Sequence, residues 1–181
     1  MLHPSHFEAL FPALSPLAVA RLRDCARLSG RLAGQVSGPL ALPPEAEADA
    51  SERLALQSPE RINEAGRLMG AVWHGRALQG VIDAKAVAEL DARLGRTVRL
   101  FGLRGAALAM AEAQPVSAGA LGDAIIADGH ACLAAWHEGL SEPYRRLASL
   151  KLPCRGFPAP APAEQARPII DHVLQEAADA S

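Results

Sequence analysis

The sequence predicts an all-α fold: a compact single-domain helical bundle with orthogonal packing and a tethered C-terminal helix. Half of the 181 residues are hydrophobic but only 4% are aromatic. The apolar side chains are therefore mainly Ala, Leu and Val, which favour closely packed helices. Apolar residues recur at helical spacing along most of the chain. Helix-start signals, in which Ser or Asp precedes the periodic stretch, separate these segments.

Two helices are expected before residue 35. Ser5 caps the first, over residues 3–11, and Ser15 followed by Pro16 begins a longer one that reaches residue 32–34. In the first helix the inward side chains are Phe7, Leu10 and Phe11. In the second the apolar side comprises Leu17, Leu22, Cys25, Ala26, Leu28 and Leu32. Its other side is expected to be a solvated face formed by Arg21, Arg23, Arg27 and Arg31.

The stretch from Ser58 to Met110 predicts three helices that organise the core. Ser58 caps the first, whose apolar face comprises Ile62, Ala65, Met69, Val72 and Trp73. Asp83 caps the second and Gly95 ends it, as a helix-stopping glycine does. The inner side of this second helix comprises Val87, Leu90 and Leu94. The third, over residues 96–113, is expected to be the central helix of the core because it carries two apolar stripes. These stripes are Val98/Phe101/Leu108 and Leu100/Leu103/Ala107/Met110.

Between and after these helices the pattern changes. Glycine, proline and acidic residues predict a loop over residues 35–50, and a short element at 53–56 follows it. Ser117 caps a helix that reaches Leu140, and Ser141 begins a shorter one. The inner side of the Ser117 helix comprises Leu121, Ile125, Cys132, Leu133 and Trp136. That of the Ser141 helix comprises Tyr144, Leu147 and Leu150.

The C-terminal part predicts a helix on a tether. Residues 155–163 are rich in proline and alanine, which favours an extended, fairly stiff linker. It joins a helical domain, residues 1–154, to an amphipathic helix over residues 164–181. This helix either folds back onto the domain, detaches to enter a partner's groove, or is disordered. Its apolar residues include Ile169, Ile170, Val173 and Leu174.

No residue pattern indicates a catalytic, cofactor or metal site. His130 and His137 are two helical turns apart, too far to hold one ion, and Cys132 falls on another face. Asp123 and Asp128 are expected to be solvated carboxylates. In the pair Trp73-His74 we expect the indole to pack inward and the imidazole to lie near the surface. Four glycines fall in helical patterns, where they allow close helix approach: Gly102, Gly105, Gly119 and Gly122.

Composition restricts the partners and the compartment. The net charge of −2 supplies no field to attract nucleic acid or anionic lipid. The three cysteines, Cys25, Cys132 and Cys154, are widely spaced and odd in number, which suits a reducing compartment. No apolar run reaches the roughly 20 residues of a membrane span, and the N-terminus lacks a secretion signal. We therefore expect a cytosolic protein.

Several blocks, taken together in order and spacing, resemble the SctK family of type III secretion systems, also called YscK or PscK proteins. The resemblance covers roughly residues 3–153. The blocks are His3-Pro4-Ser5, Leu54-Ala55-Leu56-Gln57-Ser58-Pro59-Glu60-Arg61, Arg67-Leu68-Met69-Gly70, Val81-Ile82-Asp83, Leu94-Gly95 with Arg99-Leu100-Phe101, Gly129-His130-Ala131-Cys132-Leu133, and Leu150-Lys151-Leu152-Pro153.

The resemblance implies a non-enzymatic adaptor of the sorting platform beneath the injectisome. Proteins of this family link the cytoplasmic forkhead-like domain of the inner-membrane ring protein SctD to the pod protein SctQ. Through SctQ they connect to the SctL–SctN ATPase complex. The implied location is the cytoplasm, at the inner-membrane face of the secretion apparatus, with no cofactor, nucleic acid or small-molecule substrate.

Two groups of residues are candidates for partner binding. The first is a basic cluster near the end of the domain, Arg145, Arg146 and Lys151, whose alternative is a set of solvated charges. The second is the apolar side of the C-terminal helix: Ile169, Ile170, Val173 and Leu174. The competing functions are a cytosolic helical chaperone or other binding module and a small metal-dependent enzyme using the His130–His137 region.

Overall fold

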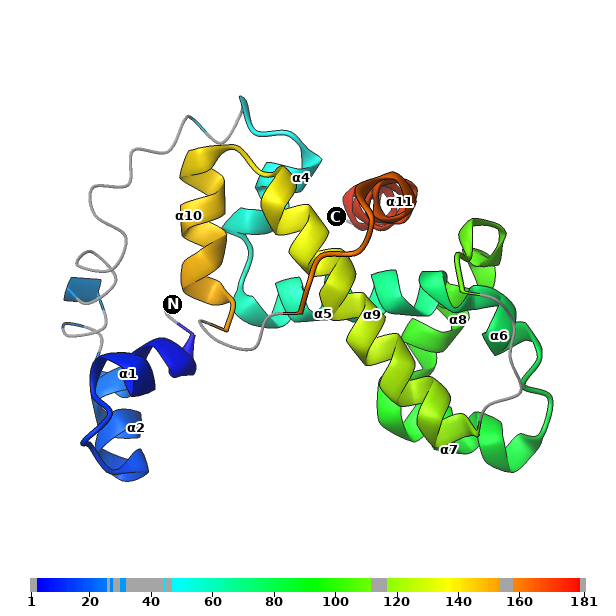
Figure 1. The fold of residues 1–181 in the computed structure, drawn as a ribbon, viewed down its shortest axis with the longest axis horizontal. Helices are drawn as coiled ribbons and strands as arrows, with labels where there is room; N and C mark the ends of the chain where they lie inside the picture. Colours follow the sequence, from blue (N-terminus) through cyan, green and yellow to red (C-terminus); the bar gives the residue numbers. More distant parts are fainter. Residues whose placement is uncertain are drawn as a thin grey trace. The chain divides into compact units, whose positions relative to one another are not determined.

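Helices account for all regular structure in the residues that the computed structural model describes, which are 3–25, 27, 30–31, 44, 47–111, 117–153 and 158–179 (Figure 1). The predicted all-α class is therefore confirmed. Across those residues no helix has both the length and the apolar composition needed to cross a membrane. The elements are α1 (Pro4–Leu10), α2 (Pro16–Asp24), α4 (Ala50–Leu56), α5 (Pro59–Trp73), α6 (Gly75–Gln79), α7 (Ala84–Leu94), α8 (Arg96–Arg104), the 3-10 helix η2 (Ala106–Leu108), α9 (Ala118–Gly139), α10 (Glu142–Lys151) and α11 (Ala163–Asp179).

The helices group into two compact units. Unit 1 comprises Met1–Ile62 and Gly139–Phe157, and unit 2 comprises Asn63–Glu138 and Pro158–Ser181. The division falls inside α5 and at the end of α9, so both helices contribute residues to both units. The C-terminal helix belongs to unit 2. The predicted limits of domain, linker and C-terminal helix stay a prediction.

Unit 1 joins segments that are far apart in the sequence through hydrogen bonds to backbone carbonyls. The Nε2–H of His6 lies 2.9 Å from Ser149 O and 3.1 Å from Leu152 O. The backbone N–H of His3 donates to Leu150 O at 2.7 Å. A small apolar cluster under α1 and α2 consists of Phe7, Val19 and Leu150, with Leu22 packed against it. These contacts fasten α1 to the last turn of α10.

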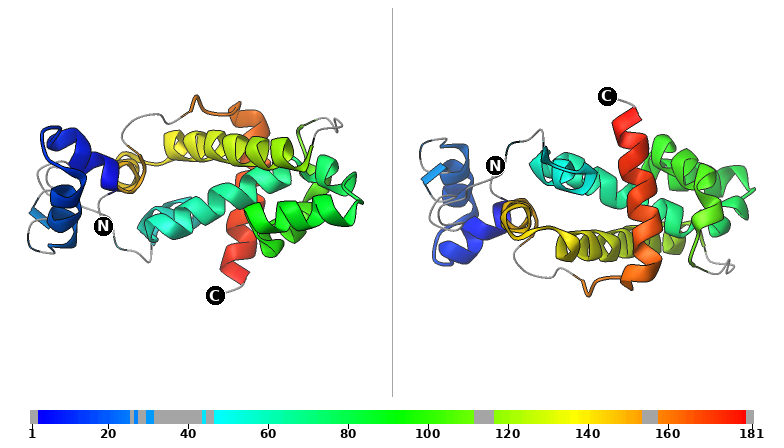
Figure 2. Two further views of the ribbon diagram at one scale, coloured as in Figure 1. Left: turned by 90° about the horizontal axis from the view of Figure 1, so that it is seen from below. Right: turned by 90° about the horizontal axis from the view of Figure 1, so that it is seen from above.

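In unit 2, α5 and α9 approach each other so closely that only glycine fits at their contact. A Cβ added at Gly70 would lie 1.9 Å from Ile125 O, and one at Gly129 would lie 2.3 Å from Gly66 O. Figure 2 shows α5 and α9 side by side, with α11 running across their direction. Gly66 and Gly70 are four residues apart, hence on one face of α5. Of the glycines predicted to allow close helix approach, Gly102 does so, because a Cβ there would meet Ala71 O at 2.5 Å.

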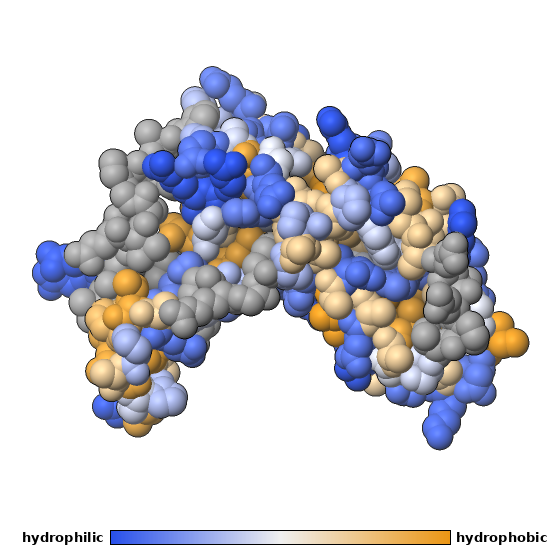
Figure 3. All heavy atoms as spheres, viewed as in Figure 1, coloured by the Kyte–Doolittle hydropathy of each residue, from blue (hydrophilic) through white to orange (hydrophobic). Residues whose placement is uncertain are grey.

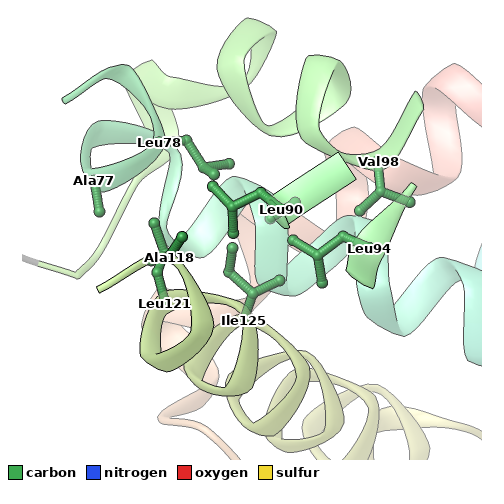
Figure 4. Packing of buried hydrophobic residues seen from close by; sticks show 9 residues of the cluster. Ala77, Leu78, Leu90, Leu94, Val98, Ala118, Leu121 and Ile125 are labelled. Carbon is green, nitrogen blue, oxygen red and sulfur yellow. The ribbon is translucent and has the colours of Figure 1, made fainter. Parts of the chain in front are cut away.

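Next to this contact, α7 and α9 bury a continuous apolar cluster (Figure 4). The start and end of α7 are as predicted: Asp83 accepts a hydrogen bond from Ala86 N at 2.8 Å, and Gly95 follows the last helical residue with φ 92°. Leu90 is fully buried. The cluster comprises Ala71, Ala77, Leu78, Leu90, Leu94, Val98, Ala118, Leu121 and Ile125. It places the core of unit 2 around α5, α7 and α9.

The predicted central helix over residues 96–113 is wrong in length and in position. α8 ends at Arg104, and Gly105 separates it from η2. Each stripe is buried only in part. Val98 and Phe101 of the first stripe are buried but Leu108 is half-buried, and Leu103 of the second packs against the core cluster. Leu100 and Met110, on the second stripe, are each 39% exposed. The interior position predicted for this helix belongs to the α5–α9 pair.

Three details of the N-terminal helices also differ from the prediction. The N-cap of α1 is His3, whose side chain accepts from Ser5 N, rather than Ser5 itself. Leu10 and Leu17 are exposed instead of turned inward, and so is Cys25. Ser15 caps α2 as expected, but α2 ends at Asp24. Most of its predicted continuation and of the loop over 35–50 lies outside the described residues, as does Cys154.

Candidate protein-binding surfaces

The two arginines of the predicted basic cluster lie on the exposed side of α10. Both contact Glu142: Arg146 Nε lies 2.7 Å from Glu142 Oε1, and Arg145 Nη2 bonds Glu142 Oε2. Hydrogen bonds from Arg145 and then Arg146 lower the pKa of the Glu142 carboxyl. Glu142 therefore offsets part of the positive charge of the two arginines. It is solvent-accessible, and its role in partner binding stays a prediction.

Lys151 does not belong to that surface, which corrects the predicted cluster of three cations. Its side chain points inward, where Nζ donates to Ala55 O at 2.6 Å and to Gln57 O at 2.7 Å. Burial lowers the pKa of Lys151. Both carbonyls lie at the C-terminal end of α4, where a cation is favoured by the helix dipole. Lys151 therefore fastens α10 to α4 inside unit 1.

The apolar side chains of α11 are covered by unit 2. Ile169 and Val173 are 0% and 1% exposed, and Ile170 and Leu174 are also buried. The His172 ring stacks at a tilt on Phe101, with 5.4 Å between ring centroids. In this arrangement a partner can contact the four residues only if α11 separates from unit 2. Their assignment to partner binding stays a prediction.

An exposed face of α8 combines charge with an apolar side chain, and sequence reasoning placed part of it in the core. Arg96 and Arg104 are exposed and lie one turn on either side of Leu100. The guanidinium of Arg104 lies 5.5 Å from the centroid of the Phe101 ring. Arg96, Leu100 and Arg104 follow one another at intervals of four residues, and this spacing was the signal in the sequence that could have revealed the face.

An exposed apolar surface, which sequence reasoning also missed, is the corner between α1 and α2. Leu10, Leu14 and Leu17 are 45%, 42% and 66% exposed. Figure 3 shows hydrophobic side chains gathered over α1 and α2. Exposed apolar groups that gather in this way mark sites of contact with other molecules. Pro12 and Pro16, which confine the corner to a short turn, were the available signal in the sequence.

Three of the remaining polar candidates, His74, Asp123 and Asp128, pair with side chains of unit 2. His74 is buried, contrary to its predicted surface position, and its Nε2 lies 2.6 Å from Asp128 Oδ2. Trp73 is half-buried. Asp123 pairs with Arg93. Burial raises the pKa of the Cys132 thiol to about 12, with a smaller contribution from Asp128, so this thiol is uncharged at neutral pH.

Potential metal ligands do not converge in the part of the chain that is described. Across that part no three His, Cys, Asp or Glu side chains are placed to hold one ion. The absence of enzymatic activity stays a prediction.

These observations define an all-α protein of two compact units, with exposed leucines at the α1–α2 corner of unit 1 and an exposed face of two arginines and one leucine on α8 of unit 2. Two known proteins are similar to it: the nodulation protein NolU of Rhizobium fredii and that of Sinorhizobium fredii strain NBRC 101917 / NGR234. Each is 34% identical over 170 residues, which cover 90% of this chain and 75% of the relative. The chain belongs to the family of the nodulation protein NolU. No family model matches it, and no solved structure matches it.

Proposed function

We propose that this protein is a non-enzymatic adaptor of a type III secretion system. In this role it links the cytoplasmic domain of the ring protein SctD to the pod protein SctQ, and through SctQ to the SctL–SctN ATPase complex. It acts in the bacterial cytoplasm, against the inner-membrane face of the apparatus. The task requires two protein-binding surfaces on one chain. Unit 1 offers the α1–α2 corner and the Arg145/Arg146 surface, and unit 2 offers the exposed face of α8.

One observation carries the proposal: five of the seven sequence blocks that resemble SctK contact another block in the structure. The block at 150–153 contacts the block at 3–5 through the bond from His3 N to Leu150 O. It contacts the block at 54–61 through Lys151 and Ala55 O. A Cβ at Gly70, in the block at 67–70, would lie 2.9 Å from Gly129 N, in the block at 129–133. Contacts between blocks that are far apart in the sequence support the interpretation that the matches belong to one shared fold and are not unrelated short fragments.

The direct test is binding between purified proteins. The full chain is mixed with the SctD cytoplasmic domain and with SctQ from the same bacterium, singly and together, and the complexes are resolved by size-exclusion chromatography with light scattering. We expect binary complexes with each protein and a ternary complex that forms only when the chain is present. Failure to bind either protein would refute the adaptor role.

The same experiment locates one surface. Reversing the charges at Arg145 and Arg146 to Glu is expected to weaken one binary complex about tenfold or more, because like charges then face an acidic partner. Arg53→Glu, an exposed arginine of α4 in the same unit, serves as the matched control. If both variants bind as the wild type does, the Arg145/Arg146 surface is a solvated face.

A further inference from the structure

The two sides of α8 have different surroundings. Val98, Phe101 and Gly102 turn inward and are buried. On the opposite side, Arg96, Leu100 and Arg104 follow one another at intervals of four residues and form a single stripe. In an α-helix four residues advance about 6 Å, so the two guanidinium groups flank the leucine along the helix axis.

The charged side chains of the segment that carries this stripe are all basic. Residues 92–111 contain four arginines and no aspartate or glutamate. Arg93 pairs with Asp123, and Arg99 forms a two-point contact with Asp91, at 2.5 Å and 3.1 Å. The hydrogen bond from Arg99 lowers the pKa of Asp91, with smaller contributions from the charges of Arg99 and Arg96. Asp91 and Asp123 are thus already paired, and the exposed stripe retains positive charge at both ends.

Arg104 is also held in place. Its guanidinium lies 5.5 Å from the Phe101 ring centroid, a geometry that favours a cation over the ring face. A side chain that is already oriented loses less conformational entropy when it binds a carboxylate. The planar guanidinium presents paired N–H donors that match the two oxygens of a carboxylate.

We propose that the exposed face of α8, formed by Arg96, Leu100 and Arg104, docks an acidic amphipathic helix of a protein partner. An apolar side chain of that helix covers Leu100, and a carboxylate on either side binds each arginine. Charge complementarity selects this occupant, while the exposed leucine supplies the apolar centre that protein interfaces surround with polar groups. The inference rests on the proposed adaptor function and adds to it the chemistry that one partner presents.

The test uses the full chain titrated calorimetrically with purified SctD cytoplasmic domain and, separately, with SctQ. The variants are Arg96→Glu/Arg104→Glu and Leu100→Ser, and Arg67→Glu, an exposed arginine on α5 in the same unit, is the control. We expect the double variant to weaken one partner about 30-fold or more and Leu100→Ser about tenfold. Arg67→Glu should stay within twofold of the wild type. Equal binding by all variants, in the presence of wild-type binding, overturns the inference and leaves the adaptor function intact.

If neither SctD nor SctQ binds, the proposed function is refuted. A second measurement then still tests the docking surface on α8. A photo-crosslinking amino acid is placed at position 100 of the full chain in living cells, with position 67 as the control. Support requires an adduct mapped to an acidic amphipathic segment of a protein and lost in the Arg96→Glu/Arg104→Glu background. No adduct, an adduct that survives charge reversal, or an adduct with nucleic acid or lipid overturns the inference.

Discussion

Unit 1 and unit 2 hold their helices together in different ways. In unit 1, cationic and imidazole side chains reach across to backbone carbonyls, as Lys151 does to α4 and His6 does to the end of α10. In unit 2, glycines bring the backbones of α5 and α9 together with almost no side chain between them. A Cβ at either Gly30 or Gly139, which lie in unit 1, would meet no atom within 4 Å.

This difference predicts that the two units are destabilised by different kinds of substitution. A hydrogen bond from a side chain tolerates small changes of distance, but losing the donor leaves buried carbonyls without a partner. A contact between two backbones contains no group that can be lost, but it has no room for an added atom. Unit 1 should therefore be broken by removing donors and unit 2 by adding volume or by uncovering its apolar residues.

The largest expected effect is in unit 2, on deletion of residues 158–181. The deletion removes Ile169, Ile170, Val173 and Leu174, all buried. Burying one such side chain is worth about 1.5–3 kcal/mol, so the loss is expected to be roughly 5 kcal/mol or more. That is comparable to the whole stability of a typical domain. Hydrogen exchange followed by mass spectrometry should show lost protection across residues 63–111 and 117–138.

Two results decide this prediction. Glu176→Ala, an exposed position on the same helix, should leave exchange in unit 2 unchanged. A truncated protein that keeps the wild-type protection of unit 2 but no longer binds one partner would contradict the prediction. It would instead favour a helix that separates from unit 2 to enter a partner's groove.

A smaller effect, also in unit 2, is expected from Gly129→Ala. The new methyl group would lie 2.3 Å from Gly66 O, a backbone atom that cannot move without shifting α5. Overpacking of this kind costs about 3 kcal/mol. Gly139→Ala is the matched control on α9, because a Cβ there meets nothing within 4 Å and alanine favours the helix by up to about 1 kcal/mol. In urea denaturation Gly129→Ala should unfold at a lower midpoint than Gly139→Ala. Equal midpoints would show that α5 and α9 can move apart at little cost in stability.

How much of this was readable from the sequence depends on the kind of signal. The N-cap at Asp83 and the helix end at Gly95 were predicted because capping is local, within a few residues of the chain. The buried face of α5 was predicted from its spacing, and Ile62, Met69 and Val72 are fully buried. Such features can be predicted without knowing which element packs against the helix.

Features that depend on the neighbouring element were not readable. Apolar spacing in residues 96–113 could not reveal that Leu100 and Met110 stay exposed, so Leu100 was assigned to the core. Lys151 was grouped with Arg145 and Arg146 because they are close in sequence, yet its partners are on α4, 96 and 94 residues away. The glycines of the α5–α9 contact show their purpose only when both helices are known.

The smallest effect is expected in unit 1, from Lys151→Met. Methionine fills a similar volume but cannot donate, so Ala55 O and Gln57 O lose the bonds that close the end of α4. Leaving such buried acceptors without a donor costs about 1–3 kcal/mol. Arg146→Met, at an exposed position of the same helix, should change stability by no more than about 0.5 kcal/mol. Exchange protection should fall in α4 and α10 and stay unchanged in α7.

The pH dependence of the stability of Lys151→Met, compared with that of the wild type, tests how burial affects the protonation of Lys151. Because burial lowers the pKa of Lys151, the folded chain releases this proton at a lower pH than the unfolded chain, whose lysine titrates near its ordinary value of about 10.4. Between those two pKa values the unfolded chain binds more protons, so the free energy of unfolding of the wild type rises with pH. Lys151→Met lacks the titrating group, and its deficit relative to the wild type should therefore grow between neutral pH and about pH 10. A deficit that shrinks over this range would mean that the two carbonyls hold the ammonium ion more strongly than burial disfavours it.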